Sequence, residues 1–126
     1  MPSESRKRVE EVMSTPVVTI SADASVREAA VSMREHDINA LLVPGSATGI
    51  ITSTDVLDAV VDEEDLEALA VRDVMTVPVE TITSHLMLQE AAAMMLNFGI
   101  KHLPVVDRDG EYVGMVSSSD TVSVYA

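Results

Sequence analysis

The chain has 126 residues, 47% of them hydrophobic, which is enough to bury the core of about one domain. Its net charge of −13 repels nucleic acid, so we expect no nucleic-acid partner. The absence of Cys excludes disulfides, thiolate metal sites and a Cys nucleophile, and no apolar run approaches the ~20 residues of a membrane span.

The first half begins with a polar tail at residues 1–8, which does not resemble a signal peptide, so we expect a cytoplasmic protein. An extended segment is expected at 17–20, and an amphipathic helix follows, with Ser25 and Glu28 as its capping box. The apolar stripe of this helix is Val26, Ala29, Ala30 and Met33. Strands are predicted at 40–43 and 50–52, a closing helix from about 54 to 61, and an acidic linker at 62–70.

The second half has the same order of elements. An extended segment is predicted at 79–82, then a helix with the stripe Leu88, Ala91, Ala92 and Met95, which has Met87 at the capping position. Strands are predicted at 102–106 and 112–117, joined by a Gly-containing turn, and a closing helix begins near Ser119.

The two halves are an internal repeat. A shift of 62 residues aligns Val12-Met13 with Val74-Met75, and Glu28-Ala29-Ala30 with Glu90-Ala91-Ala92. The expected fold class is α/β (α+β), with two tandem β-α-β-β-α repeats at 9–61 and 71–126 related by a pseudo-two-fold axis. A repeat of this size has a small core, so we expect the two copies to pair and to form a ligand cleft between them.

Two sequence signatures are each present twice. The opening signature is Val-Met-Ser-Thr-Pro-Val-Val-Thr-Ile at 12–20 and Val-Met-Thr-Val-Pro-Val-Glu-Thr-Ile at 74–82. The closing signature is Gly-Ile-Ile-Thr-Ser-Thr-Asp at 49–55 and Gly-Met-Val-Ser-Ser-Ser-Asp at 114–120. Both signatures resemble those of the CBS domain family, in which a pair of such repeats is a Bateman module.

The resemblance implies an adenosine ligand between the repeats, with Asp55 and Asp120 accepting from ribose hydroxyls and Thr52 and Ser117 near phosphate. It places the adenine pocket at the loop after each opening Met and at the start of the second strand. The residues concerned are Thr15, Pro16, Val17, Asn39, Ala40 and Leu41, and then Val77, Pro78, Val79, Lys101, His102, Leu103 and Pro104. Thr52-x-x-Asp55 and Ser117-x-x-Asp120 also read as N-capping boxes, and one residue can serve both roles.

The two copies differ in charge. Lys101 and His102 of the second copy correspond to Asn39 and Ala40 of the first. Because basic groups favour phosphate, the second site is predicted to be the better nucleotide site, and the first weak, empty or filled by an uncharged nucleoside. A lone His such as His102 is equally well explained as a packed or surface side chain.

The sequence has no P-loop, dinucleotide fingerprint or zinc pattern, so we expect no enzyme and no catalytic cofactor. The expected regulatory ligand is AMP or S-adenosylmethionine, with ADP and ATP as further candidates. The expected partners are a second copy in a disc-like homodimer and an effector protein. The alternative is an interaction or dimerisation module without a nucleotide; a third reading has the acidic stretch 62–67 bind divalent ions. The acidic surface fits a salt-adapted host or merely a soluble acidic protein.

Overall fold

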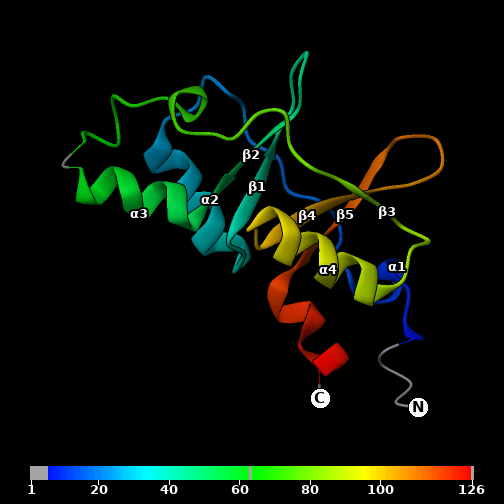
Figure 1. Cartoon of the computed structure of the whole chain (residues 1–126). Coiled ribbons are helices and arrows are strands. Elements are labelled where there is room, and N and C mark those ends of the chain that lie inside the picture. Colours follow the sequence, from blue (N-terminus) through cyan, green and yellow to red (C-terminus); the bar gives the residue numbers. More distant parts are fainter. Residues whose placement is uncertain (1–5, 63, 126) are drawn as a thin grey trace. The chain divides into compact units, whose positions relative to one another are not determined.

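The computed structural model describes residues 6–62 and 64–125, and these divide into two compact units. Residues 18–79 form the central unit, and residues 6–17 together with 80–125 form the terminal unit, which contains both described ends of the chain. Figure 1 shows that each unit combines helices with short strands. Within the described residues, no helix is long and apolar enough to cross a membrane.

The central unit contains two helices that pack around a two-stranded sheet. Helix α2 spans Val26–His36, α3 spans Ser53–Val61, and the 3-10 helix η2 spans Val71–Asp73. Strands β1 (Ala40–Val43) and β2 (Gly49–Thr52) pair antiparallel, with Ala40 opposite Thr52. The segment predicted as extended at 17–20 forms only an isolated parallel bridge, from Thr19 to Leu42. The core residues of the unit are Ala29, Met33, Leu41, Val43, Ile51 and Val71.

The terminal unit has a three-stranded sheet in the order β3-β4-β5. Strand β3 (Ile82–Thr83) is parallel to β4 (His102–Val106), and β5 (Tyr112–Ser117) is antiparallel to β4. The unit also contains α1 (Val9–Val12), α4 (Leu88–Phe98) and η3 (Ser118–Tyr125). In Figure 1 the red η3 follows β5 and is a neighbour of the yellow α4. The closing helix that the sequence predicts near Ser119 is a 3-10 helix, and it begins at Ser118. The core residues are Val9, Ile82, Leu88, Ala91, Met95, Leu103, Val105 and Val116.

The compact units do not coincide with the sequence repeats, because each contains the opening segment of the other repeat. Val9 begins the first repeat, yet it is buried in the terminal unit, and its N–H donates to the carbonyl of Leu86 at 2.8 Å. Val71 begins the second repeat and is buried in the central unit, where its N–H donates to the carbonyl of Ala24 at 2.8 Å. Each compact core is thus assembled from both repeats.

The same exchange satisfies the free N–H groups at the start of the long helices. The Val26 N–H of α2 donates to the carbonyl of Leu69 at 2.8 Å, and the Leu88 N–H of α4 donates to the carbonyl of Lys7 at 2.8 Å. The predicted capping box of Ser25 is confirmed, because its Oγ accepts from the Glu28 N–H at 3.0 Å. The later part of the predicted acidic linker therefore belongs to the helix cap, since Leu66 and Leu69 both supply carbonyls to α2.

Two glycines of the closing signatures, Gly114 and Gly49, lie where the opening segment of the other repeat crosses the sheet. Ser14 bridges to Met115 in the terminal unit, and Thr76 bridges to Ile50 in the central unit. A Cβ added to Gly114 would lie 2.6 Å from the Met13 sulfur and 2.8 Å from the Ser14 carbonyl oxygen. The corresponding closest distances at Gly49 are 3.0 Å. A side chain at Gly114 would collide with the crossing backbone, and one at Gly49 would make an unusually tight contact with it, so the terminal unit is the tighter of the two.

The helical stripes lie on the buried faces as the sequence predicts, with one difference. All four stripe residues of α4 are buried, as are three of the four in α2. Ala30 is only half-buried, so the α2 stripe is narrower than the spacing indicates. Met87 provides no side-chain cap to α4, but Glu90 accepts from the Met87 N–H at 2.7 Å and so keeps half of the capping box.

Candidate functional site

The terminal unit holds the Asp120 carboxylate at the junction of β5 and η3. Asp120 Oδ2 accepts from the Ser117 N–H at 2.8 Å and from the Ser117 hydroxyl at 3.1 Å. The Ser118 N–H donates to the carbonyl of Lys101 at 2.8 Å, which fixes this junction beside the start of β4. The Asp120 side chain is half-buried and held in one orientation by its own strand end.

The central unit repeats this geometry at the junction of β2 and α3. Asp55 Oδ2 accepts from the Thr52 N–H at 2.8 Å and from the Thr52 hydroxyl at 3.1 Å. The Asp55 N–H points back to the Thr52 hydroxyl at 3.4 Å, and the Ser53 N–H donates to the carbonyl of Asn39 at 2.9 Å. The two pairs thus share both hydrogen bonds to Oδ2, and among the described residues only the central unit adds the bond from the Asp N–H.

These contacts confirm that Thr52 and Asp55 form a full capping box on α3, whereas Ser117 and Asp120 show only its carboxylate half, and they leave a second acceptor on each carboxylate. Oδ2 is used twice in each unit, whereas Oδ1 of Asp55 and of Asp120 takes part in no hydrogen bond among the described residues. An ionised carboxylate is acceptor-only and has lone pairs on both oxygens. Each unit therefore presents an oriented acceptor next to a hydroxyl and a helix start.

The two units differ at the strand residue opposite that hydroxyl. His102 on β4 is directly opposite Ser117 on β5, and the corresponding pair in the central unit is Ala40 opposite Thr52. Burial lowers the pKa of His102 below its usual 6.5, the Asp120 carboxylate opposes this decrease, and Lys101 adds to it. The His102 side chain is half-buried, so this imidazole belongs to the same local environment as Asp120.

The structure places the opening loops of the two repeats in different units. Thr15, Pro16 and Val17 belong to the terminal unit, together with Lys101, Ser117 and Asp120. Val77, Pro78 and Val79 belong to the central unit, where the Val79 N–H donates to the carbonyl of Thr48 at 2.9 Å. Within a compact unit, each loop therefore accompanies the strands of the other repeat. Both X-Pro bonds in these loops are cis.

Four of the predicted adenine-pocket residues have side chains that belong to the protein core. Leu41 and Leu103 are 0% exposed, Ala40 is 5% exposed, and Pro104 is among the fully buried side chains. Their side chains are already packed in this structure, so a ligand beside these strands would meet their backbone. Asn39, Lys101, Thr15, Pro16, Val77 and Pro78 are exposed.

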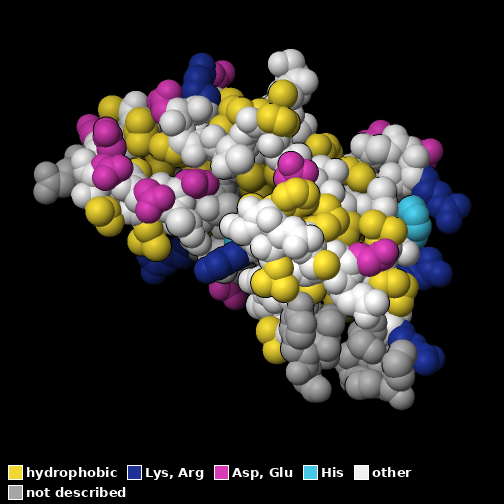
Figure 2. All heavy atoms as spheres, in the orientation of Figure 1, with side chains coloured by type: hydrophobic (Ala, Val, Ile, Leu, Met, Phe, Trp, Pro, Cys, Tyr) yellow, Lys and Arg dark blue, Asp and Glu magenta, His cyan; other side chains and the backbone are white. Residues whose placement is uncertain are grey.

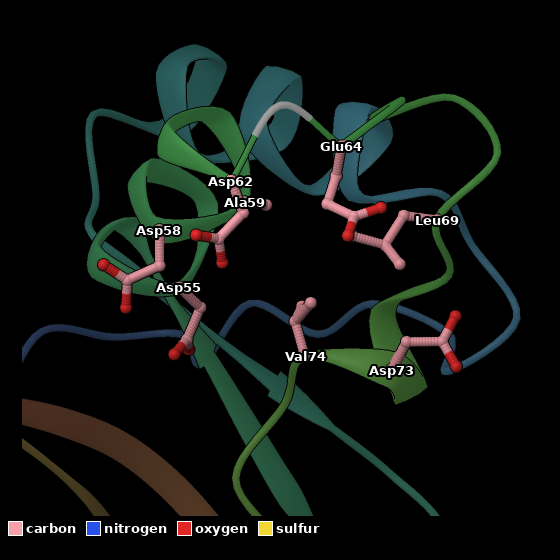
Figure 3. Close-up of a pocket in the computed structure, with 8 residues that line it drawn as sticks. All are labelled: Asp55, Asp58, Ala59, Asp62, Glu64, Leu69, Asp73 and Val74. Carbon is pink, nitrogen blue, oxygen red and sulfur yellow. The ribbon is translucent and has the colours of Figure 1, made fainter.

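A surface pocket of about 340 Å³ lies beside Asp55 in the central unit, and its polar lining is wholly acidic (Figure 3). Asp55, Asp58 and Asp62 come from α3 and its C-terminal cap, Glu64 from the linker, and Asp73 from η2. Figure 2 shows acidic side chains gathered over α3. The remaining lining residues are Ala59, Leu69 and Val74, so no basic group offsets the carboxylates within this pocket. Sequence reasoning missed this pocket.

The described residues of the acidic stretch are not arranged as a metal site. Among the residues that the structure describes, no three His, Cys, Asp or Glu side chains are arranged to hold a metal ion. The metal-linked interpretation of 62–67 is therefore without support in the described part of that stretch. A second feature missed from sequence is Ser119, whose Oγ lies 2.8 Å from Ser117 Oγ and adds a hydroxyl beside Asp120. The run of three serines before Asp120 was the available signal.

Comparison with known proteins gives a consistent result. The model of the CBS domain family matches residues 9–62 and 71–126. An uncharacterized protein of Methanopyrus kandleri is 33% identical over 92% of this chain and 61% of its own length. The inosine-5′-monophosphate dehydrogenase of Korarchaeum cryptofilum is 37% identical over 90% of this chain, but only 23% of that enzyme is covered. The solved CBS domain pair of protein MJ0100, in complex with 5′-methylthioadenosine and S-adenosyl-L-methionine, has a TM-score of 0.83 at 29% identity and covers 94% of this chain and 95% of its own.

Proposed function

Because this chain belongs to the CBS domain family as a tandem pair of its repeats, we propose that it is a regulatory module that senses an adenosine-containing ligand. The observation that carries the proposal is the repeated half-site, in which a carboxylate is held by one oxygen and presents the other. Another solved relative, 29% identical, is a putative signal-transduction protein with CBS domains from Burkholderia ambifaria. We expect the output to pass to an effector protein.

The carboxylate suits a ribose. The two hydroxyls of a cis-diol are donors, and Oδ1 of Asp55 or Asp120 is an acceptor with lone pairs that the described residues do not use. Because the strand end already holds Oδ2, a sugar that binds Oδ1 would not have to order the side chain first, which lowers the entropic cost of binding. The expectation that both half-sites line one cleft remains a prediction.

The terminal unit is the better candidate for a phosphate-bearing ligand. Lys101, which is exposed, supplies a cation next to β4, and Ser117 and Ser119 supply hydroxyls at the start of η3. In the central unit, Asp55 instead borders a pocket lined by four further carboxylates. The negative charges of these carboxylates repel an anion, so the central unit suits a neutral or cationic adenosine compound.

Two ligand classes follow from this difference. AMP, with fewer charges than ADP or ATP, fits the terminal unit of a chain whose overall field opposes polyanions. S-adenosylmethionine carries a sulfonium cation and fits the acidic surroundings of the central unit. The complex of the MJ0100 pair with 5′-methylthioadenosine and S-adenosyl-L-methionine supports adenosine compounds that lack phosphate as the second class.

A specific surface feature favours an interaction role as well. Leu57, Val60 and Val61 lie at i, i+3 and i+4 on α3 and are 61%, 52% and 77% exposed. In the terminal unit, Leu96, Phe98 and Val122 are likewise exposed. Isolated exposed apolar residues are ordinary, but a stripe on one helix face is typical of an interface. We therefore keep a homodimer, or a dimerisation module without a nucleotide, as the second candidate.

Thermal unfolding with AMP, ATP, S-adenosylmethionine or 5′-methylthioadenosine tests the proposal. A ligand that binds only the folded chain at about 100 times its Kd adds about 2.7 kcal/mol to the free energy of unfolding. We expect stabilisation by at least one of the four. The Asp120→Asn variant should lose most of the stabilisation by AMP, and Asp109→Asn, on an exposed turn, should keep it. No stabilisation by any of them would contradict the sensor and leave the interaction module.

A further inference from the structure

One cross-strand pair in the terminal unit combines a titratable group with the candidate phosphate site. His102 and Ser117 are direct partners on antiparallel strands, so their side chains are on the same face of the sheet, with Cβ atoms about 5 Å apart. Ser117 is also the residue whose N–H and hydroxyl hold Asp120. The imidazole therefore lies beside the hydroxyl and the carboxylate that the proposed function assigns to ligand binding.

The charged groups around His102 come from two places. Asp120 on η3 favours the protonated imidazole, and Lys101, immediately before β4, disfavours it. Strand β3 has no titratable residue, and the only one on β5 is Tyr112, which pairs with Val106 at the other end of β4. On α4 the only titratable group is Glu90, in the first turn, whereas His102 follows the C-terminal end of that helix.

In the protein without ligand, the influences on His102 together favour its neutral imidazole. Burial is the largest influence on His102 and lowers its pKa, and the attraction of Asp120 offsets this only in part. A dianionic phosphate that arrived beside Ser117 would add a second negative group, which would raise the pKa of the imidazole. An uncharged adenosine compound would bring no such group.

We propose that His102 couples phosphate binding in the terminal unit to protonation, so that acidification shifts the preference of this module from an uncharged adenosine compound toward AMP. The inference rests on the proposed function and adds its regulation. The central unit lacks this coupling, because Ala40 occupies the position of His102. At a pH between the pKa of the imidazole in the free protein and its pKa in the AMP complex, the ring changes from neutral to charged as AMP binds, and the complex takes up a proton.

The direction of the effect follows from linkage. If the pKa of His102 is higher in the AMP complex than in the free protein, AMP binds more tightly as pH falls between these two values, by up to about tenfold for each unit of difference. The AMP phosphate itself titrates near pH 6, and its protonation opposes the effect. Only a comparison of variants separates the two contributions.

The test is the ratio of the Kd of 5′-methylthioadenosine to that of AMP, measured by calorimetry on the full chain at about pH 7.5 and about pH 5.5 at constant ionic strength. His102→Gln keeps a polar side chain without the charge, His102→Ala reproduces the Ala40–Thr52 pair of the central unit, and His36→Gln removes an exposed His elsewhere. For the wild type and His36→Gln, we expect this ratio to rise about tenfold more on acidification than it does for either His102 variant. AMP binding should also take up more protons in the wild type than in either His102 variant within this pH range, seen as a dependence of the heat on the buffer.

Two results overturn the inference, and they are distinguishable. If AMP binds and the ratio changes equally in the wild type and both His102 variants, the coupling is wrong and the proposed function stands. If neither compound binds at either pH, the proposed function fails and the coupling fails with it.

Discussion

The central and terminal units use one backbone arrangement and surround it with opposite chemistry. In both, an Asp after the closing strand accepts from the N–H and the hydroxyl of the residue that ends the strand, at 2.8 and 3.1 Å. Around Asp120 stand Lys101, His102 and Ser119, whereas Asp55 borders a pocket of carboxylates. The shared contact of the Asp with the strand end therefore has a structural role, and we expect the charge of the neighbouring residues to decide which ligand each unit prefers.

The largest expected difference between the units is steric. Gly114→Ala should destabilise the chain by about 1–3 kcal/mol, because the new Cβ would lie 2.8 Å from the Ser14 carbonyl oxygen, a backbone atom that cannot move alone. Gly49→Ala, with its closest contacts at 3.0 Å, should cost less. Urea unfolding measures both. Gly45→Ala, with 3.4 Å to its nearest atom, is the control, and equal losses for all three would refute the steric explanation.

Substitution of Asp55 and of Asp120 should lower stability to a similar extent but affect AMP binding differently. Asp55→Ala and Asp120→Ala should each lower the free energy of unfolding by about 1–2 kcal/mol, because each loses two charge-assisted hydrogen bonds at a helix start. Only Asp120→Ala should greatly weaken AMP in a binding titration. Asp109→Ala, on an exposed turn, is the control for stability. Equal weakening of AMP by the Asp55 and Asp120 variants would remove the proposed asymmetry.

Acidification of the ligand-free protein should reveal the effect of His102 on stability, which the central unit lacks because Ala40 is at the corresponding position. Because the folded pKa of His102 is below its usual 6.5, the unfolded chain binds more protons between these two values. The contribution of His102 to stability is therefore fully present above pH 6.5 and is lost as pH drops toward the folded pKa. Thermal melts across this range should show a smaller loss for His102→Gln than for the wild type. A steeper loss in the variant would mean that burial does not dominate at His102.

The smallest expected effect concerns the acidic pocket. Asp58 and Asp62 are like charges four residues apart, and Asp62 is the C-cap of α3, where the helix dipole disfavours an acid. Asp62→Asn should therefore raise the free energy of unfolding by about 0.2–0.5 kcal/mol at low salt, and the gain should vanish at high salt. Asp109→Asn in the terminal unit provides the comparison. A gain that persists at high salt would point to a cause other than charge.

The sequence predicted the parts of this fold that depend on local pattern. The stripes of α2 and α4, the Ser25 cap and the paired strands follow from spacing that is visible in a short window. The repeated closing signature predicted the capping box of Thr52 and Asp55 and the matching carboxylate contact at Ser117, while the ligand role of these residues stays a prediction. The difference between Lys101-His102 and Asn39-Ala40 was also visible in the alignment of the two copies.

The sequence did not predict which repeat's core each opening segment packs into. Val9 and Val71 are equivalent in the repeat, and the apolar faces available to them in either copy are similar, so composition does not reveal that each joins the core of the other copy. The caps of α2 and α4 by the carbonyls of Leu69 and Lys7 use backbone atoms, which carry no side-chain signal. The acidic pocket draws on α3, the linker and η2, which come together only in the folded chain.

The central claim is that the terminal unit, and not the central one, holds the phosphate of an adenosine nucleotide. A crystal structure of the full chain grown with AMP tests this most directly. The account predicts phosphate beside Ser117 and Lys101, with a ribose hydroxyl donating to the Oδ1 atom of Asp120. Phosphate bound only beside Thr52 and Asp55 would contradict it.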